Sequence, residues 1–171
     1  MKLILISGDG QGAGRTFLAN KMTDNKSQIF SIVNIIRRQL EQKYPKYDWY
    51  NKSAEYKLKT VVSNTSKTIM QHLDELGRGM KKNDPLVWAK QMVEILEYAR
   101  DHEKHDTVVL DDIRFVDEYS FIKDKLHKEN ILHFHVCWDT AKPEPNYENE
   151  KLKLFADYLV TRQPKSSIPT K

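Results

Sequence analysis

The chain alternates between short, continuous apolar runs and longer stretches in which apolar residues recur at helical spacing. A continuous apolar run predicts a buried strand, because a strand that is covered on both faces presents no polar side. Runs of this kind occupy residues 3–7, 29–33, Thr107–Leu110, 131–137 and 158–160. Strands that alternate with helices predict a parallel sheet with right-handed crossovers. We therefore expect an α/β fold with three layers, in which helices flank a five-stranded parallel sheet.

Helices are expected between these runs. They cover residues 16–23, 35–40, 53–76 (with a break near 63–64), 86–99, 117–127 and 152–155. Asn34 is a residue type that caps helix starts, and Gly77 is a residue type that ends helices. Asp84 and Pro85 predict another start, with aspartate as the cap and proline in the first helical position. At 171 residues the chain is expected to form a single domain with a substantial core.

Glycines are concentrated directly after the first predicted strand, where four of the six in the chain fall within residues 8–14. Glycine lets a backbone approach an anion closely, and the start of the following helix adds N–H donors and a positive dipole end. This segment therefore predicts a binding site for a polyphosphate. The residues expected to form it are Gly10, Gln11, Gly12, Ala13, Gly14, Arg15 and Thr16.

Two phosphate-binding loops compete for this pattern. The spacing Gly8-x-Gly10-x-x-Ala13 loosely fits a dinucleotide-binding loop, but that loop needs an acid after the second strand, where the chain has Asn34. The other candidate is the P-loop of nucleotide triphosphatases and kinases, in which a basic residue and a hydroxyl follow the last glycine. A turn with a purely structural role is the third alternative.

Arg15 and Thr16 supply the basic residue and the hydroxyl, so we favour the P-loop. The fit is imperfect, because Asp9 stands where the strict pattern has glycine and Arg15 stands in place of lysine. Arginine keeps the positive charge and forks onto phosphate oxygens, although it is bulkier than lysine.

An acid pair, Asp111 and Asp112, follows the third apolar run. The carboxyl ends of parallel strands meet at one edge of the sheet, so this pair and the glycine loop are expected to face one site. In that site Thr16 would ligate Mg²⁺, Asp111 or Asp112 would hold the water shell of the metal, and Arg15 would contact the outer phosphates of ATP. The alternative for the acid pair is a solvated strand end.

The overall charge of +4 and the isoelectric point near 9.0 suit anionic partners, either nucleotides or nucleic acid. The single cysteine, Cys137, excludes an internal disulfide and fits a reducing compartment. The first apolar run is far shorter than the roughly 20 residues that span a bilayer, and no signal-peptide pattern follows it. We expect a cytoplasmic protein without a membrane partner. His133 and His135 share a strand face as a candidate metal pair, but without a third ligand we favour strand packing.

Several segments, in the right order, resemble the deoxynucleoside monophosphate kinase family, best known from bacteriophages. Residues 109–118 resemble that family's Asp-x-Arg-Phe-x-x-Glu segment after the third strand. Residues 71–78 and 84–88 resemble its glutamine-containing helix end, Gly-Arg pair and downstream tryptophan. Residues 34–37 stand where the family has a short turn and a lysine, and residues 156–160 resemble its final strand.

The resemblance implies a P-loop kinase fold over residues 1–171, with a helical substrate-binding insertion at about 34–106 and a shortened lid at about 139–150. It implies a phosphotransferase that uses ATP and Mg²⁺ to convert a deoxynucleoside 5′-monophosphate into the diphosphate. Gln71 and Trp88 would help to shape the nucleotide pocket. Many members of the family are dimers, so a homodimer is among the expected assemblies.

The resemblance also gives roles to charged residues. Arg15, Asp112 and Arg114 would be catalytic, and Arg37, Arg78 and Arg114 would contact the substrate phosphate or the transferring group. These roles suit phosphoryl transfer, which needs positioning and positive charge more than a covalent nucleophile. A surface ion pair is the alternative for each arginine.

Two other functions remain open at this stage. One is a kinase whose acceptor is a modified base within DNA, although nucleic acid is not expected as the main partner. The other is a nucleotide-binding regulator without turnover. It is suggested by Arg15 in the lysine position and by the absence of arginine from the expected lid.

Overall fold

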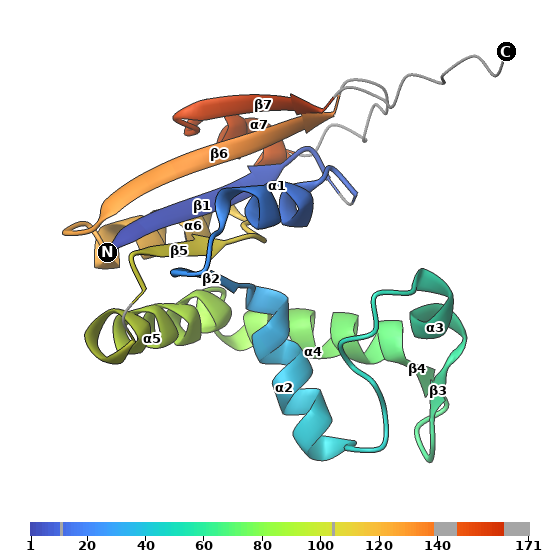
Figure 1. Cartoon of the computed structure of the whole chain (residues 1–171). Coiled ribbons are helices and arrows are strands. Elements are labelled where there is room, and N and C mark those ends of the chain that lie inside the picture. Colours follow the sequence, from blue (N-terminus) through green and yellow to red (C-terminus); the bar gives the residue numbers. More distant parts are fainter. Residues whose placement is uncertain (11, 104, 139–146, 163–171) are drawn as a thin grey trace, which may run out of the picture.

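A five-stranded sheet in the order β2-β5-β1-β6-β7 forms the centre of the molecule (Figure 1). The computed structural model describes residues 1–10, 12–103, 105–138 and 147–162. The strands are β1 (Lys2–Gly8), β2 (Ser27–Phe30), β5 (Thr107–Leu110), β6 (Asn130–Trp138) and β7 (Tyr158–Arg162). Every neighbouring pair in this sheet is parallel. The predicted α/β fold with five parallel strands is therefore confirmed.

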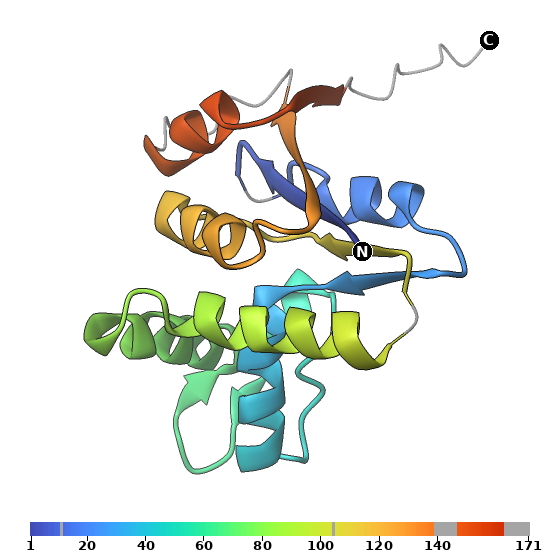
Figure 2. The same cartoon turned by 90° about the vertical axis from the view of Figure 1, so that its left-hand side faces the viewer.

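Helices cover both faces of the sheet (Figure 2). Helix α1 (Arg15–Met22) packs Ala19 against Ile4 and Ile6, the even-numbered side chains of β1. Helices α5 (Val87–His102), α6 (Val116–Lys125) and α7 (Tyr147–Leu154) pack on the other face, in one core with Leu3 and Leu5. Because strand side chains alternate between faces, β1 contributes to both layers of the core. The expected three-layer arrangement is confirmed.

The connections that follow the adjacent strands β1 and β5 leave the sheet toward opposite faces. The chain leaves β1 toward α1 on one face, whereas it leaves the adjacent strand β5 toward α6 on the other face (Figure 2). In open α/β sheets, a crevice forms outside the carboxyl ends of neighbouring strands whose connections diverge in this way. The glycine loop and the acid pair follow these two strands, so both lie at the carboxyl ends of the sheet, where such crevices form.

A mostly helical segment lies beside the β2 edge of the sheet (Figure 1). It contains α2 (Ile32–Lys43), α3 (Ala54–Lys59), α4 (Ile69–Asn83) and α5, together with an antiparallel hairpin of β3 (Val61–Val62) and β4 (Lys67–Thr68). This segment occupies most of the predicted 34–106 insertion. Buried residues such as Trp49 and Trp88 belong to the same core as the sheet, so the segment packs on the sheet as part of one unit.

The second strand is shorter than predicted. It ends at Phe30, and Ser31 instead of Asn34 occupies the N-cap position of α2. Ile32, Ile36 and Leu40 are all buried, at the four-residue spacing of one helix face. The prediction was wrong here because the apolar run crosses the boundary between the strand and the helix without a break.

The predicted helix at 53–76 is also wrong, because a hairpin interrupts it. Asn64 and Ser66 have positive φ angles of 64° and 55° and form the turn of that hairpin. The break expected near residues 63–64 does occur, but two short strands flank it.

Gly77 does not end a helix, because it lies inside α4. A Cβ atom at this position would lie 3.3 Å from Cδ1 of Ile36, so the glycine admits the close approach of α2. Asp84 follows the last residue of α4, and Leu86 instead of Asp84 is the N-cap residue of α5. The Asp84 carboxylate accepts a hydrogen bond from the Leu86 amide at 3.0 Å, which connects the two helices through a tight turn.

No helix among the described residues has both the length and the apolar character needed to cross a bilayer. The predicted lid residues 139–146, and Gln11 of the predicted phosphate loop, lie outside the described residues.

Trp88 connects α4 to α5 and is expected to be a major contributor to stability. Its side chain is 1% exposed, and its Nε1–H donates a hydrogen bond of 2.9 Å to the Gly77 carbonyl. We expect Trp88→Ala to lower the free energy of unfolding by about 3–5 kcal/mol, measured by urea denaturation. Tyr98 on the same helix is 59% exposed, and Tyr98→Ala should change that free energy by less than about 1 kcal/mol. Similar losses of unfolding free energy in both variants would contradict a major contribution of Trp88 to stability.

Candidate functional site

The glycine loop connects β1 to α1 through a left-handed backbone. Gly10, Gly12 and Gly14 have φ angles of 145°, 81° and 104°, a region that side-chain-bearing residues rarely adopt. Gly14 is the N-cap residue of α1, and among the described residues no side chain caps this helix. The start of α1 therefore directs its first-turn N–H groups and the positive end of its dipole outward.

A shallow pocket of about 210 Å³ lies at this helix start, lined by residues 12–17. Gly12, Ala13 and Gly14 in this lining have little or no side chain, and Arg15 and Thr16 are its polar residues. Exposed N–H groups at a helix N-terminus form a general anion-binding arrangement. The described part of the glycine loop thus places glycine residues with positive φ angles directly before a helix start, and phosphate binding at this loop stays a prediction.

Thr16 ties this loop to the acid pair. Its hydroxyl donates a 2.9 Å hydrogen bond to Oδ2 of Asp111, which follows β5. The other carboxylate oxygen of Asp111, Oδ1, is buried and has no hydrogen-bond partner among the described residues. Burial raises the pKa of Asp111 above its ordinary value, although the Thr16 and Ser31 hydroxyl groups oppose that rise. A buried carboxylate with a spare oxygen beside a hydroxyl is a suitable pair of ligands for a hard cation.

Asp112 holds two guanidinium groups. Its Oδ1 atom lies 2.7 Å from Nε of Arg114 and 3.3 Å from Nη2 of Arg15. Burial lowers the pKa of Arg15, and the Asp112 carboxylate opposes this shift. Burial also acts to lower the pKa of Arg114, but Asp112, Glu118 and Asp111 together outweigh it, and that pKa is raised overall. The glycine loop and the segment after β5 are therefore linked by hydrogen bonding and by charge.

Arg37 on α2 belongs to the same electrostatic cluster. Burial lowers its pKa, while Asp112 and Asp111 raise it and Arg114 lowers it further. Nη1 donates a 2.8 Å hydrogen bond to Asn34, but Nε is buried without a partner among the described residues. The structure thus brings three of the predicted arginines, Arg15, Arg37 and Arg114, around the acid pair.

Two further charged residues adjoin this cluster, and the sequence analysis gave neither a role. Lys81 on α4 forms a 2.6 Å ion pair with Glu118 on α6, and its Nζ lies 3.4 Å from the centroid of the Phe115 ring. Glu118 is buried, and burial raises its pKa, while Lys81 opposes the rise. The resemblance segment contained Glu118, whereas Lys81 was given no role in this site.

Lys57 and Tyr50 also surround Arg37. Burial lowers the pKa of Lys57, and the Arg37 charge lowers it further. The Arg37 guanidinium lies 6.0 Å from the centroid of the Tyr50 ring. Both residues come from the region between α2 and the β3–β4 hairpin, which sequence analysis treated as a loop and a helix without assigned function. The sequence analysis gave neither residue a role in this site.

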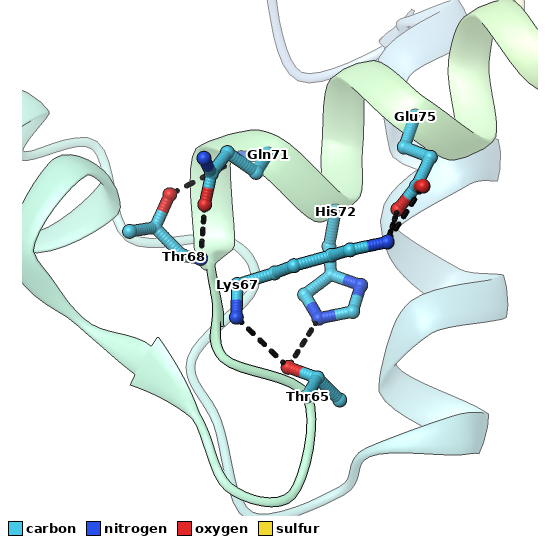
Figure 3. A network of polar contacts seen from close by, with 6 residues as sticks. All are labelled: Thr65, Lys67, Thr68, Gln71, His72 and Glu75. Atoms are coloured by element: carbon cyan, nitrogen blue, oxygen red, sulfur yellow. Dashed lines mark hydrogen bonds and ion pairs between the residues drawn. The ribbon is translucent and has the colours of Figure 1, made fainter.

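Three predicted substrate-binding residues contact other partners. Gln71 forms a capping box with Thr68 at the start of α4, and its Oε1 accepts from the Thr68 amide at 2.8 Å (Figure 3). Arg78 is largely exposed and donates from Nε to Asp74 on the same helix. Trp88 lies in the core. Each residue satisfies a local structural need, and the structure does not draw these three into the cluster around Asp112.

The polar contacts next to Gln71 stabilise the hairpin and the start of α4. Lys67 pairs with Glu75 at 2.7 Å, and the Thr65 hydroxyl lies 2.9 Å from Nε2 of His72 (Figure 3). These contacts join β4 and its turn to the first two turns of the helix. The network is structural, and it explains why Gln71 faces the hairpin.

The site combines a glycine loop at a helix start, a hydrogen-bonded hydroxyl and carboxylate, and three arginines that interact electrostatically with Asp112. This is the set of groups that binds and orients phosphoryl groups. A scan against protein-family models and a search of curated proteins each found no match for this chain. The family resemblance therefore stays a prediction from sequence motifs, and a functional argument depends on the geometry of the site.

Proposed function

We propose that this chain is a deoxynucleoside monophosphate kinase, which transfers the γ-phosphoryl group of ATP to a 5′-monophosphate and releases two diphosphates. One observation carries the proposal: the helix that follows the glycine loop is joined to the acid pair, with Thr16 bonded to Asp111 at 2.9 Å and Arg15 beside Asp112 at 3.3 Å. A glycine turn with a purely structural role would not need to be joined to the acid pair.

ATP is proposed to bind with its phosphates at the start of α1. The first-turn N–H groups donate to phosphate oxygens, and the helix dipole favours their negative charge. The Arg15 guanidinium then exchanges its contact with Asp112 for the outer phosphates. Its five N–H donors suit this exchange, because they match the geometry of phosphate oxygens.

Thr16 and Asp111 fit a Mg²⁺ ion. Both offer oxygen ligands, and Asp111 Oδ1 is a buried polar atom for which the described residues provide no hydrogen bond. Mg²⁺ bound there would neutralise part of the phosphate charge. Thr16 and Asp111 orient each other through their hydrogen bond, so the pair is organised in advance.

The acceptor phosphate is proposed to lie against Arg37 of α2, which interacts electrostatically with both acids, and Arg114, which pairs with Asp112. Two guanidinium groups from separate elements orient a monoester and offset the charge that accumulates during transfer. Such positioning accounts for catalysis without a covalent intermediate. Lys57 and Tyr50 lie next to Arg37 and extend this side of the site.

Arg37 and Arg38 are adjacent on α2 and provide a matched pair for testing the acceptor site. Arg37 is half-buried near the acids, whereas Arg38 is exposed. We expect Arg37→Ala to reduce kcat/KM for the monophosphate by about 10–100-fold, because a hydrogen bond to a charged group contributes about 1.5–3 kcal/mol. Arg38→Ala should stay within about twofold of the unaltered chain. The measurement is ADP release in a coupled assay, and equal effects of the two substitutions would remove Arg37 from the site.

Arg15 tests the ATP side of the site. Arg15→Ala should weaken ATP binding or turnover by at least about tenfold, through loss of a charge-assisted contact. Arg15→Lys should recover most of this loss, because lysine retains the charge. Calorimetric titration with ATP, together with steady-state kinetics, measures both quantities. Unchanged binding and turnover in Arg15→Ala would exclude this residue from the phosphate site.

The same assay separates the proposed function from the two alternatives. Turnover with a free deoxynucleoside monophosphate supports the proposal, and a series of such substrates identifies the base that is accepted. Phosphate transfer from labelled ATP to DNA alone would indicate a kinase acting on a base. ATP binding without transfer to any acceptor would indicate a regulator.

A further inference from the structure

A row of polar side chains crosses the sheet on the face that α6 and α7 cover. His133, His135 and Cys137 alternate along β6 and therefore share one face. The parallel register pairs Ser7 of β1 with His135, and Asp9 follows at the end of β1. The sequence analysis weighed the two histidines as a metal pair and favoured packing because it found no third ligand. The strand register brings the Asp9 carboxylate to the histidines, and the alternation along β6 places the Cys137 thiol on the same face.

Three ligand atoms converge at the end of this row. The carboxylate of Asp9, the imidazole of His135 and the Sγ atom of Cys137 all lie within 4.8 Å of one another. Nε2 of His135 is 2.8 Å from Oδ1 of Asp9. Ligand atoms held at about 2.0–2.3 Å from one Zn²⁺ ion lie roughly 3–4 Å apart, so small side-chain rotations are enough to place a cation between them.

Ser7 orients the histidine of this cluster. Its hydroxyl lies 2.8 Å from Nδ1 of His135 and 2.7 Å from Nε2 of His133. A metal-binding histidine almost always uses its second ring nitrogen for a hydrogen bond that fixes the ring. Here Ser7 holds Nδ1, which leaves Nε2 directed at Asp9. Ser7, His133 and His135 are all fully buried, so the packing holds the ring in place.

We propose that Asp9, His135 and Cys137 form a binding site for Zn²⁺ that is separate from the Thr16–Asp111 pair. Thiolate and imidazole are ligands that select zinc, whereas Mg²⁺ prefers oxygen alone. His135 is buried, but Asp9 and Cys137 are partly exposed and leave a route for the ion. Three protein ligands leave a fourth position for water. Lys153 and Glu150 of α7 both act electrostatically on His135 and Cys137.

The site has a structural consequence for the glycine loop. Asp9 is the residue between Gly8 and Gly10, so a cation held by Asp9 attaches the beginning of the loop to β6. Zn²⁺ bound to the folded chain and not to the unfolded chain also raises the melting temperature.

Titration of the full-length, chelator-treated chain with Zn²⁺ in nucleotide-free buffer tests the proposal by calorimetry. We expect one equivalent to bind, and we expect Cys137→Ser and Asp9→Asn each to weaken binding at least about tenfold. Both substitutions nearly preserve side-chain size, and circular dichroism checks that each variant folds. His127→Gln, a change at an exposed histidine, is the matched control and should bind like the unaltered chain.

Co²⁺ provides a second readout that reports the thiolate directly. The unaltered chain should show a thiolate-to-cobalt charge-transfer band that Cys137→Ser lacks. The proposal is overturned if no Zn²⁺ binds, if binding survives both Cys137→Ser and Asp9→Asn, or if the band is absent. Because these measurements contain no nucleotide, their failure leaves the proposed kinase activity untouched, and failure of the kinase assays leaves the zinc site untouched.

Discussion

The hydrogen bond between Thr16 and Asp111 is the contact on which the candidate site depends. It exists because β1 and β5 are adjacent and parallel, so the segments that leave their carboxyl ends meet at one edge of the sheet. The glycine loop supplies donors for an anion there, and the acid pair supplies acceptors for cations.

The charges at this edge are arranged for binding more than for stability. A partly desolvated ion pair gains little net free energy, since the loss of hydration offsets the attraction between its members. Asp112 nevertheless holds Arg15 and Arg114 together, and the charge of the same carboxylate raises the pKa of Arg37 against the effect of burial. Three guanidinium groups near two acids retain unused donors, and a phosphate group satisfies them well. We infer that an anion completes this cluster.

Two kinds of cation ligand lie on opposite sides of the same loop. Thr16 and Asp111 offer hard oxygen atoms near the start of α1, whereas Asp9, His135 and Cys137 offer oxygen, nitrogen and sulfur near the end of β1. The oxygen ligands suit Mg²⁺, whereas the mixed oxygen, nitrogen and sulfur ligands suit Zn²⁺, so the two neighbouring groups would select different metals. The loop is thus held at both ends by polar contacts that the sheet register creates.

Local patterns predicted much of this molecule. Each of the five apolar runs predicted one of the five parallel strands, and β1 and β5 are buried along almost their whole length, as a continuous apolar run predicts. The glycine loop and the acid pair were also found from sequence, since a left-handed turn needs glycine and a strand end favours polar residues. Long-range contacts account for the rest. Gly77 fits inside a helix because Ile36 approaches it, and Lys81 meets Glu118 only because α4 and α6 both pack against α5. Asp9 meets His135 and Cys137 through strand register, since the two strands are more than 100 residues apart in the chain and no local pattern records their alignment.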